Sequence, residues 1–212
     1  MFRIKICGVT CVEDAGFAAA SGADAVGVNF YKGSRRYVPP GAAASIVRAA
    51  RDGGATPVAV FVNERPEVIA AICRDLGIDV VQLSGNEPAD EAARLPFRRI
   101  KAVRLAEGVD VMAAFGDYPC DALVLDAGGP GEFGGTGRRL DWAKIPGCGI
   151  RKAWMLAGGL TPENVRAAIR AARPGGVDVA SGVEDRAGHK DAEKVKLFIR
   201  YAAEGLDSER LS

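Results

Sequence analysis

Histidine is almost absent from this sequence, since His189 is the only one among 212 residues. Metal sites built on imidazole ligands use several histidines, and a Ser-His-Asp triad needs one beside its nucleophile. The single histidine therefore argues against both kinds of site. The five cysteines show no metal-type pairing, at positions 7, 11, 73, 120 and 148. An odd number of unpaired cysteines indicates free thiols in a reducing, cytoplasmic setting.

Long hydrophobic runs and a charge excess are missing as well. No uninterrupted apolar run approaches the length that crosses a membrane. Arg3 and Lys5 interrupt the N-terminal apolar stretch, so we expect no secretory signal. Lys and Arg together number 28, and Asp and Glu together number 27. Bulk charge therefore favours neither nucleic acid nor a membrane surface as a partner.

The sequence does contain a regular alternation of short apolar runs and amphipathic segments. The runs are mostly continuous in apolar residues, as expected for parallel strands covered on both faces. They are residues 3–7, 25–30, 57–62, 79–83, 99–103, 121–126, 152–156 and 177–181. Eight strands with intervening helices predict an α/β fold, a single-domain (β/α)8 TIM barrel over residues 1–212. An open doubly wound sheet is the alternative, weakened because no G-x-G-x-x-G motif follows the first run.

Helix patterns and helix-start signals lie between these runs. Apolar residues recur at the spacing of one helix face in residues 165–172 and 195–202. Thr10 with Glu13 resembles a capping box, and Thr161-Pro162 places Pro at a first helical position. We expect helices to begin at both places. The charged segment 190–194 is typical of a solvated helix start.

Two glycine-containing turns follow the seventh and eighth runs. One holds Gly158 and Gly159, and the other holds Gly182 and Val183. Glycine lets a backbone come close to a ligand, and the loops after the last two strands of a barrel are where a phosphate usually sits. Backbone N–H groups of these turns would donate to it. The pair predicts that a small phosphorylated molecule binds here.

Three polar residues at or near strand ends could carry chemistry. Cys7 ends the first run, where barrel enzymes place catalytic groups, although burial as a small hydrophobe is the plainer role of a cysteine. A neighbouring positive charge would lower the pKa of its thiol and provide a thiolate base. Asp126 follows four apolar residues and is either a catalytic acid or a loop cap. Asp178 lies inside the eighth run and is either a site residue or a buried partner of Lys5.

Two connections that follow strands are longer than usual for a barrel. Residues 31–39 contain Arg35 and Arg36, and a guanidinium there could bind a carboxylate through two parallel hydrogen bonds. Because Arg36 belongs to a loop, its truncation should remove little core packing. Residues 127–139 contain Gly134-Gly135-Thr136-Gly137, which is either a flexible turn or a loop that closes over a ligand.

An ordered set of motifs along nearly the whole chain resembles one family. The motifs are Lys5-Ile6-Cys7-Gly8, Gly33-Ser34-Arg35-Arg36-Tyr37-Val38, Gln82-Leu83-Ser84-Gly85, Leu125-Asp126, Gly134-Gly135-Thr136-Gly137, Ala157-Gly158-Gly159-Leu160 and Asp178-Val179-Ala180-Ser181-Gly182-Val183-Glu184. In this order they resemble phosphoribosylanthranilate isomerase, an enzyme family of tryptophan biosynthesis. Any one of them would be weak evidence, whereas the ordered set is specific.

The resemblance implies an Amadori rearrangement of N-(5-phosphoribosyl)anthranilate to 1-(2-carboxyphenylamino)-1-deoxyribulose 5-phosphate. In it, Cys7 would remove the C2′ proton as general base, and Asp126 would protonate the ribose ring oxygen as general acid. Arg36 would bind the anthranilate carboxylate, with Asp178 and the two glycine turns in the substrate site. This chemistry needs no metal and no cofactor. The family has monomers and dimers, so we expect a monomer or a homodimer.

One position departs from the family pattern, because Ser84 stands where the family commonly has His. A serine cannot titrate near neutrality, so the role of that His is not carried over. Two other functions stay open. One is a histidine-pathway ribotide isomerase, whose family carries Asp in place of Cys7, and the other is a non-catalytic barrel that binds phosphorylated metabolites. Indole-glycerol-phosphate synthase fits less well, since it typically has a longer N-terminal extension and a Lys/Glu catalytic set.

Overall fold

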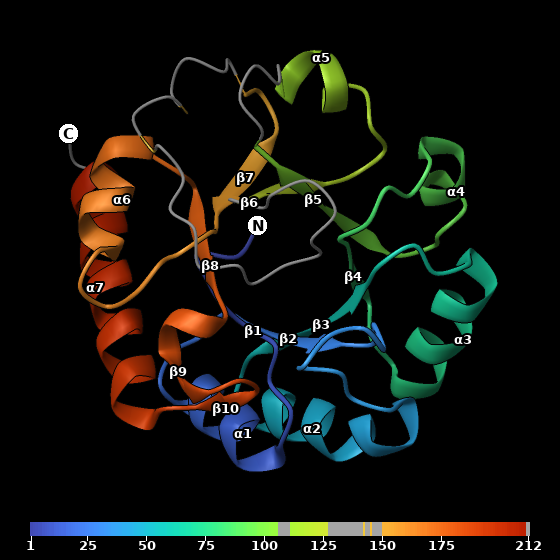
Figure 1. The fold of residues 1–212 in the computed structure, drawn as a ribbon, viewed down its shortest axis with the longest axis horizontal. Coiled ribbons are helices and arrows are strands. Elements are labelled where there is room, and N and C mark those ends of the chain that lie inside the picture. Colours follow the sequence, from blue (N-terminus) through green and yellow to red (C-terminus); the bar gives the residue numbers. More distant parts are fainter. Residues whose placement is uncertain (106–110, 127–141, 143–144, 146–149, 211–212) are drawn as a thin grey trace.

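The fold is a closed ring of eight parallel strands (Figure 1). The computed structural model describes residues 1–105, 111–126, 142, 145 and 150–210. The strands of the ring are β1 (Ile4–Cys7), β2 (Ala25–Asn29), β3 (Thr56–Phe61), β4 (Val80–Leu83), β5 (Arg98–Arg104), β6 (Ala122–Asp126), β7 (Ala153–Leu156) and β8 (Gly176–Val179). Each strand pairs with the next, and β8 pairs back with β1. The expected (β/α)8 barrel is therefore confirmed, and the open doubly wound sheet is wrong.

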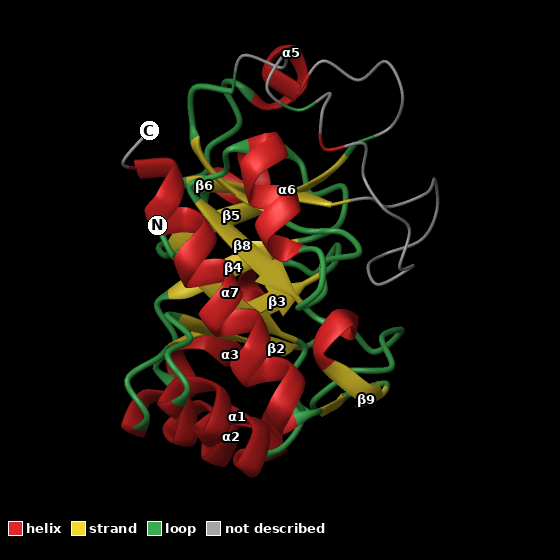
Figure 2. Cartoon of the chain, turned by 90° about the vertical axis from the view of Figure 1, so that its left-hand side faces the viewer, coloured by secondary structure: helices red, strands yellow, loops and turns green. Residues whose placement is uncertain are grey.

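Helices surround the strands on the outside of the ring (Figures 1 and 2). They are α1 (Val12–Ala20), α2 (Pro40–Asp52), α3 (Pro66–Leu76), α4 (Ala89–Ala93), α5 (Val111–Phe115), α6 (Val165–Ala172) and α7 (Ala192–Arg210). The apolar faces expected over 165–172 and 195–202 are buried in the main core, as the helical spacing predicts. Within the described part of the chain, no helix is both long and apolar enough to cross a membrane.

Two apolar layers hold the barrel together. The inner layer fills the ring with Ala25, Val58, Val80, Ile100, Val124, Met155 and Ala157. The outer layer lies between strands and helices and includes Leu123, Leu125 and Phe198. Side chains of a strand alternate between its two faces, so residues one apart belong to different layers. A residue two positions after an inner-layer residue therefore also points inward. It lies nearer to the carboxyl end of its strand.

The start of α1 differs from the expected capping box. The helix begins at Val12 with Cys11 as its N-cap residue, and no side chain caps it. The hydroxyl of Thr10 instead donates to the carbonyl of Gly188, 2.5 Å away. The expected pairing of Thr10 with Glu13 is wrong because a distant loop satisfies the hydroxyl.

The start of α6 also differs from the sequence expectation. The helix begins at Val165 rather than at Pro162. The side chain of Asn164 accepts a hydrogen bond from the backbone N–H of Thr161 and donates to the carbonyl of Gly159. These two bonds close a turn ahead of the helix, so the proline lies in that turn.

A small hairpin follows β8. The chain first makes a 3₁₀ turn, η3 (Ser181–Val183), and then pairs β9 (Glu184–Arg186) with β10 (His189–Lys190). Lys190 is 3% exposed. The expectation that segment 190–194 is a solvated helix start is therefore wrong at its first residue, and α7 begins two residues later.

Candidate active site

A cavity of about 630 Å³ opens at the carboxyl ends of the strands. This is the face at which a barrel places its functional residues, and the volume suits a metabolite-sized ligand. Inward-facing strand residues and the loops that follow them line it, among them Cys7, Gly8, Arg35, Arg36, Gln82, Ser84, Asp126, Gly158, Gly159, Asp178 and Gly182. The structure thus brings together nearly all the site residues that the sequence indicated.

Cys7 and Asp126 reach this cavity from different strands. Cys7 ends β1 and Asp126 ends β6, and both residues line the cavity. Asp126 lies two residues beyond Val124, a member of the inner layer, so strand alternation turns it inward as well. The two groups therefore open on one chamber and not on the helix layer.

The thiol of Cys7 lies beside a buried ion pair. Lys5 Nζ donates to Asp178 Oδ1 at 2.8 Å, and the side chain of Lys5 is fully buried. Removal from solvent raises the pKa of Cys7 above its usual value, and the positive charge of Lys5 only partly offsets this effect. The expectation of a lowered thiol pKa is therefore wrong, because burial outweighs the neighbouring cation.

Asp178 is the buried partner of Lys5, as one alternative expected, and it also borders the cavity. The residue is 7% exposed, pairs with Lys5 and also lines the cavity. Burial disfavours the ammonium form of Lys5, but Asp178 and the thiol of Cys7 outweigh it and raise the pKa of Lys5. Asp178 is thus a buried partner that borders the ligand space.

The two glycine turns lie against each other at the mouth of the cavity. Gly158 and Gly159 have φ values of 89° and 67°, the left-handed conformation that favours glycine. A side chain at Gly182 would collide with the carbonyl of Leu160, so the loops after β7 and β8 approach closely because Gly182 has no Cβ. The three glycines line the cavity, whereas the side chain of Val183 is buried in the core. Val183 can therefore contribute its backbone alone.

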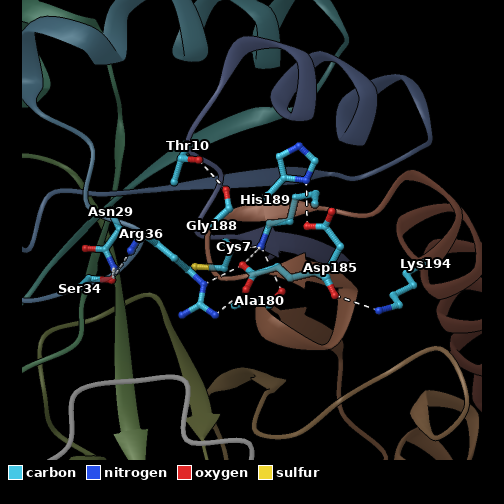
Figure 3. A network of polar contacts seen from close by, with 12 residues as sticks. Cys7, Thr10, Asn29, Ser34, Arg36, Ala180, Asp185, Gly188, His189 and Lys194 are labelled. Carbon is cyan, nitrogen blue, oxygen red and sulfur yellow. Dashed lines mark hydrogen bonds and ion pairs between the residues drawn. The ribbon is translucent and has the colours of Figure 1, made fainter.

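Arg36 extends from the loop after β2 toward Cys7 (Figure 3). Its stem lies against Gly8, where φ is 71° and an added Cβ would collide with Cδ of Arg36. Its guanidinium donates from Nε and Nη2 to the two carboxylate oxygens of Glu184, at 2.7 Å each. The neighbouring Arg35 is exposed. Arg36 thus makes a structural contact besides any core packing, because its removal would leave a buried carboxylate without this fork.

Glu184 and Lys190 lie beside the cavity, although the sequence placed them only in a motif and in a charged segment and gave neither a role. Lys190 Nζ donates to Glu184 Oε1 at 2.7 Å and to the carbonyls of Cys7 and Ala180 at 2.7 and 3.1 Å. The sequence offers two faint signals, because Glu184 ends the last of the quoted motifs and Gly188 between polar stretches is typical of a turn. Nothing in that spacing indicates that the flanking charges are buried.

Ser84 occupies the position where the family commonly has His. It lines the cavity, and its hydroxyl accepts a hydrogen bond from Gln82 Nε2 at 3.1 Å. Gln82 lines the cavity too, and within the described residues its buried Oε1 has no hydrogen-bond partner. Here a hydroxyl that is hydrogen-bonded to the amide of Gln82 thus stands where the family commonly has a titratable ring.

Two features expected from the sequence fall beyond reach of the structure. The glycine-rich segment 134–137 and Cys148 lie outside the described residues. Among the residues that are described, no group of three or more His, Cys, Asp or Glu side chains could hold a metal ion.

Comparison with known proteins decides the family. The family model described as N-(5'phosphoribosyl)anthranilate (PRA) isomerase matches residues 4–201. The chain belongs to this family. It is 42% identical over 207 residues to the N-(5'-phosphoribosyl)anthranilate isomerase of Trichlorobacter lovleyi, covering 97% of this chain and 100% of the relative. It is 45% identical over 211 residues to that of Neisseria meningitidis serogroup B, covering 94% and 96%.

Solved structures of phosphoribosylanthranilate isomerase agree with the fold. The crystal structure of the enzyme from Thermotoga maritima matches with a TM-score of 0.86 and 40% identity, over 96% of this chain and 100% of that chain. A second crystal structure holds reduced 1-(o-carboxyphenylamino)-1-deoxyribulose 5-phosphate. It matches with a TM-score of 0.84 and 39% identity over the same shares of both chains.

Proposed function

We propose that this chain catalyses the Amadori rearrangement of N-(5-phosphoribosyl)anthranilate to 1-(2-carboxyphenylamino)-1-deoxyribulose 5-phosphate, a step of tryptophan biosynthesis. One observation carries the proposal: a thiol and a carboxyl group, Cys7 and Asp126, border one cavity together with a guanidinium and two glycine turns. Membership of the phosphoribosylanthranilate isomerase family supports it.

Acid and base act on two sugar atoms that are both bonded to C1′, the ring oxygen and C2′. Protonated Asp126 donates its proton to the ribose ring oxygen while the bond between C1′ and that oxygen breaks, and the nitrogen lone pair forms an iminium. The iminium acidifies the C2′–H bond. The thiolate of Cys7 takes this proton and leaves an enolamine, which tautomerises to the ketone. Each positioned proton transfer contributes about 10²–10⁴-fold to the rate.

Three groups hold the substrate around these two residues. The backbone N–H groups of Gly158-Gly159 and Gly182-Val183 donate to the phosphate. Arg36 donates to the anthranilate carboxylate. Asp178 borders the same cavity from β8 and completes the binding residues. The close contact between the two glycine turns supports a single phosphate site between them.

We further infer that residues 1–212 act as one catalytic domain in the cytoplasm, as a monomer. Among the described residues, the large hydrophobic side chains that are exposed are Met1 and Val12, which form no extended docking face. A homodimer is the alternative, since one solved relative is a monomer generated from the dimeric enzyme of Thermotoga maritima. Light scattering on the purified chain should give the mass of one chain, and twice that mass would contradict the monomer.

A substrate comparison tests the activity. The purified chain is assayed with fluorescent N-(5-phosphoribosyl)anthranilate and, separately, with the aminoimidazole ribotide of the histidine pathway. We expect turnover of the anthranilate compound. Turnover of the ribotide alone would favour the histidine-pathway isomerase. Binding of both without turnover of either would favour a non-catalytic metabolite-binding barrel.

A crystal soaked in phosphate tests the anion site. We expect the ion between Gly158-Gly159 and Gly182-Val183. An ion found at the Arg35-Arg36 loop and not at the glycine turns would overturn the assignment.

A further inference from the structure

Glu184 is a buried carboxylate that takes no part in the proton transfers. Its side chain is 4% exposed, and it is not among the residues that line the cavity. Arg36 donates to both of its oxygens, from Nε to Oε1 and from Nη2 to Oε2. Since Arg36 itself lines the cavity, Glu184 determines which N–H groups of the guanidinium remain for a ligand.

The fork on Glu184 divides the donors of Arg36 into two edges. A guanidinium carries five N–H donors on three nitrogens. Glu184 takes the Nε–H and one N–H of Nη2, which form the side edge. The terminal edge, formed by Nη1 and the second N–H of Nη2, keeps the parallel pair that binds a carboxylate in bidentate fashion. The stem of Arg36 is confined as well, because it lies against Gly8.

Lys190 keeps this group of side chains positive. Its Nζ donates to Glu184 Oε1 at 2.7 Å, and its side chain is fully buried. Burial alone would raise the pKa of Glu184, but Arg36 and Lys190 outweigh it and hold that pKa below its usual range. Burial lowers the pKa of Lys190, and Glu184 only partly offsets this effect. Lys190 Nζ donates to three oxygens, which is the full set of donors of an ammonium group. One carboxylate between two cations then leaves a net positive charge, which attracts an anionic ligand group.

We propose, on the basis of the proposed function, that Glu184 is a positioning residue for the substrate carboxylate. It fixes Arg36 so that the terminal edge, Nη1 with Nη2, receives the anthranilate carboxylate. Lys190 offsets the negative charge of Glu184, which would otherwise cancel the positive charge of Arg36. Glu184 touches no reacting atom and acts through Arg36.

Two substitutions separate positioning from charge. Glu184→Gln removes a negative charge near the ligand carboxylate, so charge alone would tighten binding. Positioning requires the reverse, because an amide NH2 cannot accept from a guanidinium N–H and the fork breaks. Glu184→Asp keeps the charge but retracts it by one methylene. If only charge matters, this variant should bind the anthranilate compound as wild type does. If positioning matters, it should bind that compound more weakly.

The experiment compares two substrates that differ in one group. Wild type and both variants are assayed for kcat and KM on N-(5-phosphoribosyl)anthranilate and on N-(5-phosphoribosyl)aniline, which lacks the carboxylate. We expect each variant to lose about 10- to 100-fold in kcat/KM on the anthranilate compound, mostly through KM. The aniline compound should show little change. The ratio between the two substrates decides, because it does not depend on the folded fraction of a variant.

The matched control is Glu67→Gln, which breaks the exposed pair of Glu67 with Arg94 (N···O 2.6 Å). It should leave the ratio at the wild-type value. Equal losses on both substrates would overturn the inference but not the proposed function. Tighter binding of the anthranilate compound by Glu184→Gln would do the same. A wild type that turns over neither substrate would instead contradict the proposed function, and the inference with it.

Discussion

At the scale of residues, two adjacent arginines have different surroundings. Arg36 holds a buried carboxylate, whereas Arg35 is exposed, although both border the cavity. The sequence could indicate the loop and the pair of cations. It could not indicate that Arg36 is the one fixed in place, because its partner Glu184 lies 148 residues further along the chain.

Arg36→Ala should therefore affect both binding and stability. Losing a bidentate contact to the substrate should cost about 2–4 kcal/mol, or about 30- to 1000-fold in kcat/KM. Stability should fall by about 1–3 kcal/mol, because Glu184 loses the fork and keeps Lys190. Steady-state kinetics and urea denaturation measure the two effects. Arg35→Ala is the control, and the carboxylate assignment fails if Arg35→Ala is the damaging change and Arg36→Ala is silent.

Alkylation of Cys7 should require alkaline pH. Burial raises the pKa of its thiol, so the reactive thiolate is a minor form at neutrality and increases as pH rises toward that pKa. The rate of modification by iodoacetamide should rise about tenfold per pH unit above pH 7 and reach its midpoint above about 8.5, the value of a free cysteine. Peptide mass spectrometry follows Cys7 separately from the other thiols. A midpoint below that of free cysteine would contradict the dominance of burial.

At the scale of elements, strands could be predicted more closely than helix starts. Every expected apolar run became a strand with its ends shifted by at most two residues, because burial on both faces gives a continuous apolar pattern. Helix starts depend on partners that a local pattern does not contain. Thr10 shows this, since its hydroxyl donates to Gly188, 178 residues away.

The hairpin of β9 and β10 is the element that carries Glu184 to Arg36. It is attached to the start of the chain, because Thr10 donates to the carbonyl of Gly188 and the backbone N–H of Lys190 donates to Asp14 Oδ2 at 2.9 Å. The sequence shows that a turn is present here. The burial of its charges depends on contacts with β1 and α1, which lie at the other end of the chain.

Lys190→Met should destabilise the protein markedly. The change leaves Glu184 with one partner and removes the donor to the carbonyls of Cys7 and Ala180. Breaking a buried ion pair in this way costs about 3–5 kcal/mol. Lys196→Met is the control, because Lys196 pairs with Glu193 on the surface and should change stability by less than about 0.5 kcal/mol. Equal effects in urea denaturation would mean that Lys190 does not anchor the hairpin.

At the scale of the whole molecule, closure of the barrel assembles the site from both ends of the chain. The β1–β8 pairing sets Lys5 opposite Asp178 and brings Cys7 near the loop that contains Gly182. Because all parallel strands end at the same face, the sequence could predict which residues meet there. Strand alternation could also have shown that Asp178 points into the barrel, because β1–β8 pairing sets it beside Lys5, whose side chain points inward. The contact of Glu184 with Arg36 lay beyond such rules, because it depends on the shape of a loop.

The measurement that tests the central claim most directly is kcat on N-(5-phosphoribosyl)anthranilate for wild type, Cys7→Ser and Asp126→Asn. If these residues are the base and the acid of the rearrangement, each substitution should lower kcat by about 10²–10⁴-fold. Binding of reduced 1-(o-carboxyphenylamino)-1-deoxyribulose 5-phosphate should persist in both variants, because the phosphate and carboxylate contacts remain. A variant that keeps the wild-type kcat would contradict the role assigned to the residue it replaces.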